Sequence, residues 1–218
     1  MSNAIRERVL NKLREAVGRG DFDVPTPPPL PVQEWSREEK INRLQSMLET
    51  MHAEVRRTTH ADWITTLKEI LRERALQTLV YGPDTALAGV LQGAWENDLP
   101  ALIPYQQDIE SFKETLFNAD AGITTTRGAL AEIGALVLWP TIQEPRLLSL
   151  VPALHIALLE ADGIYNTFAE MMGSERWQDG MPTNALLISG PSKTADIELT
   201  LTFGVHGPKE LLVLILDN

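Results

Sequence analysis

The sequence predicts an α/β fold in which helices cover both faces of a largely parallel sheet. Strand-length apolar runs recur through the second half of the chain, and helical patterns lie between them. Near-continuous apolar strands are typical of parallel sheets, because both surfaces of each strand are buried against helices. The chain has 218 residues, of which 44% are hydrophobic. This length and composition allow one sizeable core plus an appendage without disulfides or metal ions.

The first 35 residues are predicted to form a basic helical arm and a proline-rich linker. Residues 4–19 carry a narrow apolar stripe with a spacing of four, made of Ile5, Val9, Leu13 and Val17. Five prolines then lie between Pro25 and Pro31, and such a run favours a stiff polyproline II spacer. The helix either packs on its own domain or a neighbouring subunit, which we favour, or docks onto a partner.

Residues 36–218 are predicted to form the main domain, with a helical front at 36–75 and a sheet-containing body at 76–218. The run from Ser36 to Glu39 has the capping-box pattern, in which hydroxyl and carboxylate satisfy each other's backbone N–H groups. The helix that it opens is expected to present one apolar face, made of Ile41, Leu44, Leu48, Met51 and Val55. A second helical segment follows at about 63–71.

The body is expected to alternate strands with helices. Apolar runs predict strands at residues 78–82, 102–104, 134–139, 154–159, 185–189 and 211–216. The segments between them predict helices at residues 84–93, 108–117, 163–172 and 192–202. This interleaving is what indicates a largely parallel sheet.

Charge and cysteine content exclude several classes of function. The net charge of −11 argues against binding to nucleic acid or to an anionic membrane surface, since both need a basic face. The absence of cysteine removes thiolate nucleophiles and cysteine-held iron–sulfur clusters. It also agrees with a reducing compartment. Residues 1–20 lack the apolar stretch of a signal peptide, and the longest apolar run, 147–159, is too short to span a membrane. We therefore expect a soluble, cytoplasmic protein.

The candidate binding and catalytic residues of the sequence lie in stretches that contain glycine. In the most informative one, a strand ends at Ser189, Gly190 allows a tight turn, and Ser192 can cap a helix beginning at Lys193. Backbone amides and hydroxyls at a helix N-terminus form a ready anion site. The same residues could equally form a plain connection between a strand and a helix.

Two further stretches carry a carboxylate and an imidazole. Glu132 lies on a turn before a buried strand, where its pKa could be altered. His206 lies in the Gly204–Pro208 turn and could simply bond a carbonyl, while His155 is interpreted as a satisfied core histidine. No helical spacing of histidine and carboxylate suggests zinc, so no metal site is expected. The phosphate-binding, dinucleotide-binding and serine-hydrolase loop motifs are all missing.

Taken in order, these stretches resemble the lactate utilization protein C family, the LUD-domain group. The resemblance is carried by the runs at 119–124, 131–138, 152–156, 188–198 and 204–208, and it spans about 119–216. The most specific run begins at Ser189 and ends at Glu198. This sequence departs from the family at Ile133, where the family usually has threonine. That loss of a hydroxyl puts a polar role for this position in doubt.

The resemblance implies a fold like that of the NagB, ribose-5-phosphate isomerase and CoA-transferase group. It also implies an accessory role in oxidising L-lactate to pyruvate, with iron–sulfur clusters on partner proteins and no cofactor held by this chain. One alternative is an enzyme in which Glu132, on a turn like that of CoA-transferases, forms an acyl anhydride. Another is a domain that senses a small carboxylate. Fold analogy alone does not decide among these functions.

The hypothesis for the site is an anion pocket around the turn at Gly190, with Glu132 and His206 at its rim. In this hypothesis Lys193 supplies charge and Asp196 orients the loop. The predicted ligand-binding residues are Ser189, Gly190, Ser192, Lys193, Thr194, Asp196, His206 and Gly207.

Overall fold

The computed structural model describes residues 3–18, 33–106, 108–195 and 201–218. It divides the chain into two units, residues 1–32 and residues 33–218. In the first unit, helix α1 (Asn3–Gly18) forms as predicted. The apolar stripe of α1 is exposed, from 47% at Ile5 to 68% at Val17. The predicted linker at 25–31 lies outside the described residues.

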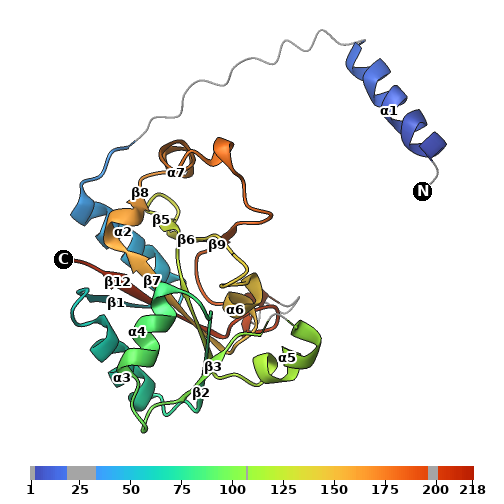
Figure 1. Cartoon of the computed structure of the whole chain (residues 1–218). Helices are drawn as coiled ribbons and strands as arrows, with labels where there is room; N and C mark the ends of the chain where they lie inside the picture. Colours follow the sequence, from blue (N-terminus) through green and yellow to red (C-terminus); the bar gives the residue numbers. More distant parts are fainter. Residues whose placement is uncertain (1–2, 19–32, 107, 196–200) are drawn as a thin grey trace. The chain divides into compact units, whose positions relative to one another are not determined.

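The second unit is built on a six-stranded sheet in which every pair of neighbours is parallel (Figure 1). The strands, in spatial order, are β1 (Glu54–Thr58), β12 (Glu210–Leu216), β7 (Leu154–Glu160), β4 (Ala121–Thr125), β2 (Thr78–Tyr81) and β3 (Ala101–Pro104). This arrangement confirms the predicted α/β class.

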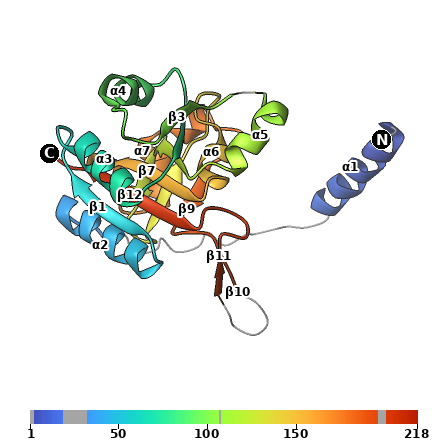
Figure 2. The ribbon, with the colours of Figure 1, turned by 90° about the horizontal axis from the view of Figure 1, so that it is seen from below.

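Alternation along β12 shows why its apolar run is continuous. Leu212, Leu214 and Leu216 belong to the core beneath α3 (Trp63–Glu73) and α4 (Ala86–Ala94). Leu211, Val213 and Ile215 belong to the core on the opposite face, which α2 (Arg37–Thr50) covers. Figure 2 shows these helices on opposite sides of the sheet. Both faces are therefore buried, as the sequence predicts.

Two further helices and a second sheet complete the layer on the α2 side. Helices α5 (Ile109–Phe117) and α6 (Arg146–Leu150) pack around Val80 and Leu148. The second sheet has four strands in the order β8 (Ile164–Tyr165), β5 (Gly128–Leu130), β6 (Ala135–Leu138) and β9 (Leu186–Ile188). Its outer face is covered by α7 (Phe168–Ser174) and a short 3₁₀ turn, η2 (Trp177–Asp179). A second 3₁₀ turn, η1 (Ala161–Gly163), follows β7.

The structure places two of the predicted strands outside the largely parallel main sheet. The runs at 134–139 and 185–189 are strands, but they form β6 and β9 of the second sheet. β5 and β6 are joined by a short turn and pair antiparallel. A parallel partner would need a crossover of a dozen or more residues, which this connection lacks.

The predicted helix at 192–202 is also wrong. Lys193–Ala195 forms strand β10, which pairs antiparallel with β11 (Leu201–Phe203). From Thr194 to Phe203 the sequence alternates polar and apolar residues, the period of a strand rather than a helix. The helical front is likewise interrupted, since α2 ends at Thr50 and Val55 belongs to β1 rather than to the face of α2.

The predicted capping box at the start of α2 is confirmed. The Ser36 hydroxyl accepts a hydrogen bond from the Glu39 backbone N–H at 3.4 Å, and the Ser36 N–H donates to the Glu39 carboxylate at 2.8 Å. Ser36→Ala is therefore expected to lower the free energy of unfolding by about 1 kcal/mol in a urea titration. Ser46→Ala, on an exposed position of the same helix, should be neutral or slightly stabilising. Equal stability of Ser36→Ala and the parent would contradict the assignment.

Candidate functional site

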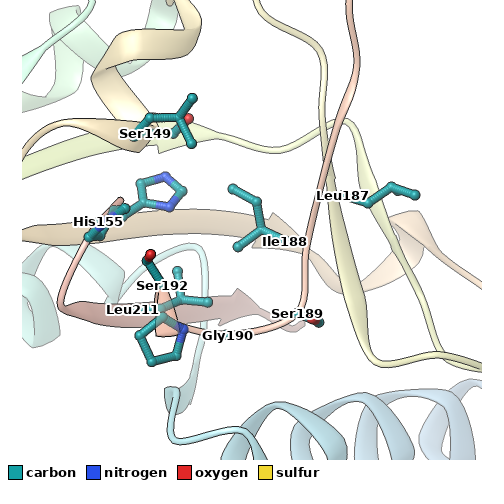
Figure 3. A pocket seen from close by; sticks show the side chains of 11 residues that line it. Ser149, His155, Leu187, Ile188, Ser189, Gly190, Ser192 and Leu211 are labelled. Carbon is teal, nitrogen blue, oxygen red and sulfur yellow. The ribbon is translucent and has the colours of Figure 1, made fainter. Parts of the chain in front are cut away.

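A pocket of about 230 Å³ lies between the main sheet and the loop that follows β9. Its polar walls come from Ser149 on α6, His155 on β7, and Ser189 and Ser192 on the loop. The remaining lining is largely apolar and includes Ile188 and Leu211. Figure 3 shows the imidazole of His155 between Ser149 and Ser192, with Ile188 facing it.

His155 is the polar group with the most informative surroundings. It is 1% exposed, and its Nε2 lies 2.9 Å from the Thr124 hydroxyl. Its Nδ1 is buried and has no hydrogen-bond partner among the described residues. Burial lowers the pKa of His155 to about 3, so the imidazole is neutral at physiological pH. A neutral imidazole has one donor and one acceptor, so one of these remains available to a ligand.

Close packing on α2 fixes the loop on the far side of the pocket. A Cβ on Gly190 would lie 2.9 Å from the Met51 carbonyl oxygen. A Cβ on Gly134, which has φ +62°, would lie 2.4 Å from Cβ of Met47. The two glycine-bearing turns therefore both contact the end of α2. Ser192 is held by its N–H, which donates to the Pro208 carbonyl at 2.9 Å.

The structure brings together Ser189, Gly190 and Ser192 in this pocket. Lys193 and Thr194 lie on β10 and do not line it, and the Lys193 ammonium contacts Met51 Sδ at 3.6 Å. Since β10 replaces the predicted helix, the helix N-terminus expected to attract an anion is absent. The lining includes no lysine or arginine. Its walls therefore offer hydroxyl groups and a neutral imidazole.

The other predicted site residues lie elsewhere. His206 and Gly207 line a neighbouring hollow of about 540 Å³, which shares Leu150 with the pocket. Glu132 is exposed on the turn between β5 and β6, where its backbone carbonyl accepts a hydrogen bond from Arg43 at 3.2 Å. Asp196 lies outside the described residues. Within the described ranges, no group of three or more His, Cys, Asp or Glu side chains could hold a metal ion.

Residues 41–216 match the family model of the LUD domain. The chain belongs to the LUD domain family. It is 33% identical over 183 residues to an uncharacterized protein of Neisseria meningitidis serogroup B, covering 83% of this chain and 78% of that one. It is 28% identical over 231 residues to lactate utilization protein C 1 of Bacillus mycoides, covering 98% of this chain and 97% of that one.

A solved structure agrees with the fold of this LUD domain. It is the crystal structure of a DUF162 family protein from Deinococcus radiodurans, with a TM-score of 0.60 and 20% identity. The match covers 84% of this chain and 100% of that chain. At this identity the likeness supports the fold alone. No helix in the described part of this LUD domain is long and apolar enough to cross a membrane.

Sequence reasoning missed two polar features of the LUD domain. His155 is buried as predicted but is not satisfied, because its Nδ1 lacks a partner. Its place after Pro152, in a run otherwise apolar, was the available signal. The second feature is a cleft of about 360 Å³ at the end of β4, which includes Arg127 and Glu144. Neither residue lies in a glycine-rich motif, so no local pattern marks them.

Proposed function

We propose that this LUD domain is the accessory component of a system that oxidises L-lactate to pyruvate, with the iron–sulfur clusters on partner proteins. The observation that carries the proposal is the family match over residues 41–216, together with full-length relatives named lactate utilization protein C. A second relative of that name, from Halalkalibacterium halodurans, covers 98% of this chain at 26% identity.

The composition supports this division of labour. Conversion of L-lactate to pyruvate removes two electrons and two protons, which must pass to an acceptor. This chain has no cysteine, so it offers no thiolate ligands for an iron–sulfur cluster. In the proposal, partner proteins accept the electrons, and this domain binds a small ligand or the partners themselves.

The pocket beside His155 is proposed to take a small, uncharged or weakly polar group. The unpartnered Nδ1 and the hydroxyls of Ser149 and Ser192 can hydrogen-bond such a group, while the apolar lining excludes water from it. The alternative of an acyl-enzyme at Glu132 has no such support, because that side chain lies on an exposed turn outside the pocket.

The test is an affinity purification of the tagged full chain from its own host grown on L-lactate. Cysteine-rich iron–sulfur proteins should be recovered with the chain and identified by mass spectrometry. A tagged unrelated protein, expressed in the same cells, controls for carry-over. Deletion of the gene should also abolish growth on L-lactate and leave growth on glucose intact. Normal growth of the deletion strain on L-lactate, without recovery of iron–sulfur proteins, would overturn the proposal.

A further inference from the structure

The strand order of the main sheet defines one position where the chain changes direction. From β2 the chain passes through α4 to β3 on one side, and then through α5 to β4 on the other side of β2. In open parallel sheets, ligands bind outside the carboxyl ends of the strands at such a switch point. In this sheet the switch point lies between β2 and β4, and the segments that follow these two strands begin at Gly82 and Thr126.

A polar cleft lies at this position. It has a volume of about 360 Å³ and is lined by Thr125, Thr126, Arg127, Trp139, Thr141 and Glu144. Thr125 is the last residue of β4, and Glu144 comes from the loop between β6 and α6. This loop is seated closely on the end of β2, since a Cβ on Gly82 would lie 2.4 Å from the Gln143 carbonyl oxygen.

The Glu144 carboxyl is held in place by Thr125. It accepts hydrogen bonds from the Thr125 hydroxyl at 2.6 Å and from the Thr125 backbone N–H at 3.2 Å. Burial nevertheless raises the pKa of Glu144 above its ordinary value, against the effect of these two hydrogen bonds. The Thr141 hydroxyl accepts from the Glu144 backbone N–H at 3.0 Å and keeps its own proton for donation.

Arg127 supplies positive charge to the same cleft. Its guanidinium lies 5.4 Å from the centre of the Trp139 ring and forms an ion pair with Glu175. Glu175 is held in turn by the Tyr165 hydroxyl, which donates to it at 2.8 Å. The Arg127 side chain remains 48% exposed. A guanidinium has five N–H donors, so this pairing leaves donors for a ligand.

We propose that this cleft binds a small organic carboxylate, with Arg127 pairing with the ligand's carboxylate and Glu144 and Thr141 bonding its remaining polar groups. Guanidinium groups pair with carboxylates through two parallel hydrogen bonds, which gives both affinity and orientation. Lactate and pyruvate belong to this class, so their choice as ligands rests on the proposed function. The position of the site rests on the geometry of the cleft.

The proposal includes a dependence on pH. The charged groups that line the cleft and the narrow hollow beside it are Arg127, Glu144 and Arg146. A bound anion disfavours a second negative charge nearby, so it raises the pKa of Glu144 further. Binding is therefore accompanied by proton uptake, and affinity weakens as the pH rises through the pKa of Glu144.

The experiment is calorimetric titration of the full chain with sodium L-lactate and sodium pyruvate. Lactamide, which has the same shape as lactate but no charge, and inorganic phosphate serve as comparison ligands. At least one of the two carboxylates should show saturable binding, and lactamide should bind at least tenfold more weakly. Arg127→Gln should lower the affinity for the carboxylate at least tenfold, while Arg127→Lys should retain part of that affinity. Glu144→Gln should remove the pH dependence.

Arg56→Gln is the matched control, because Arg56 is also an exposed arginine in an ion pair, here with Glu54, but it lies on β1 and lines neither the cleft nor the pocket beside His155. It should leave carboxylate affinity unchanged. Ser192→Ala tests instead whether the ligand occupies the pocket beside His155. Thermal unfolding of each variant separates lost binding from lost folding. Equal binding of lactamide, preferential binding of phosphate, or sensitivity to Ser192→Ala but not to Arg127→Gln would each overturn the proposal. The proposed carboxylate site and the proposed accessory role are tested independently. The titration needs no partner protein, and the affinity purification needs no intact cleft.

Discussion

Gly122→Ala is expected to lower the free energy of unfolding by about 3 kcal/mol, a large effect for a single added methyl group. Gly122 is the second residue of β4, where α6 and the segment after it approach the sheet. A Cβ there would lie 2.4 Å from the Leu148 carbonyl oxygen and 2.9 Å from Cγ of Pro152. Neither neighbour is the end of a flexible side chain, so α6 or the strand must move.

The measurement is equilibrium unfolding in urea, with Gly89→Ala as the matched control. Gly89 lies on α4, and a Cβ there would meet nothing within 4 Å. Alanine is favoured over glycine in a helix, so Gly89→Ala should raise stability by up to about 1 kcal/mol. A midpoint for Gly122→Ala that is unchanged or raised relative to the parent would contradict the close approach of α6 to β4.

The stability of the protein is expected to fall as the pH is lowered from about 6.5 towards 3, because of His155. Burial lowers the pKa of His155 from 6.5 to about 3. Between these values the unfolded chain binds a proton that the folded chain does not, so acid favours unfolding. Above pH 6.5 the group is neutral in both states and contributes no slope. The full difference is on the order of 5 kcal/mol.

Urea titrations across this range should show the slope in the parent and its loss in His155→Gln, whatever the absolute stability of that variant. Thr124→Val is the control for the surroundings. It removes the hydroxyl that lies 2.9 Å from Nε2 but leaves the imidazole buried, so the slope should persist. An unchanged slope in His155→Gln would assign the acid sensitivity to other groups.

Much of the fold could be predicted because the central strands are buried on both sides. β7 and β12 are unbroken or nearly unbroken apolar runs, and such runs can be recognised as strands from the sequence. β1 is different: it is an edge strand in which only Val55 is buried, so its sequence resembles a polar loop. The sequence also cannot show that β6 and β9 belong to a second sheet, since apolar runs do not reveal which strands pair.

The candidate site could be predicted only where polar side chains lie next to a glycine-containing turn. The run at Ser189–Ser192 contains a glycine and two hydroxyls, and it does line a pocket. Its helix was predicted because serine favours helix starts, yet the alternation after Thr194 agrees with the observed hairpin. Glu144 is a candidate site residue because its loop lies over the ends of β2 and β4. That position depends on strand order, which no local pattern encodes.

The place of β12 in the sheet sets the order in which the domain can assemble during synthesis. β12 lies between β1 and β7, so β1 has no neighbour in the sheet until residues 210–216 have been made. The strands from β2 to β7 can pair earlier, because each finds its partners among residues already synthesised. In the nascent chain, β1 therefore stays unpaired until the last strand is inserted. Until then β12 does not cover the apolar face of α2. Stalling the ribosome just before residue 210 should leave this front segment open to protease while the central strands are already protected.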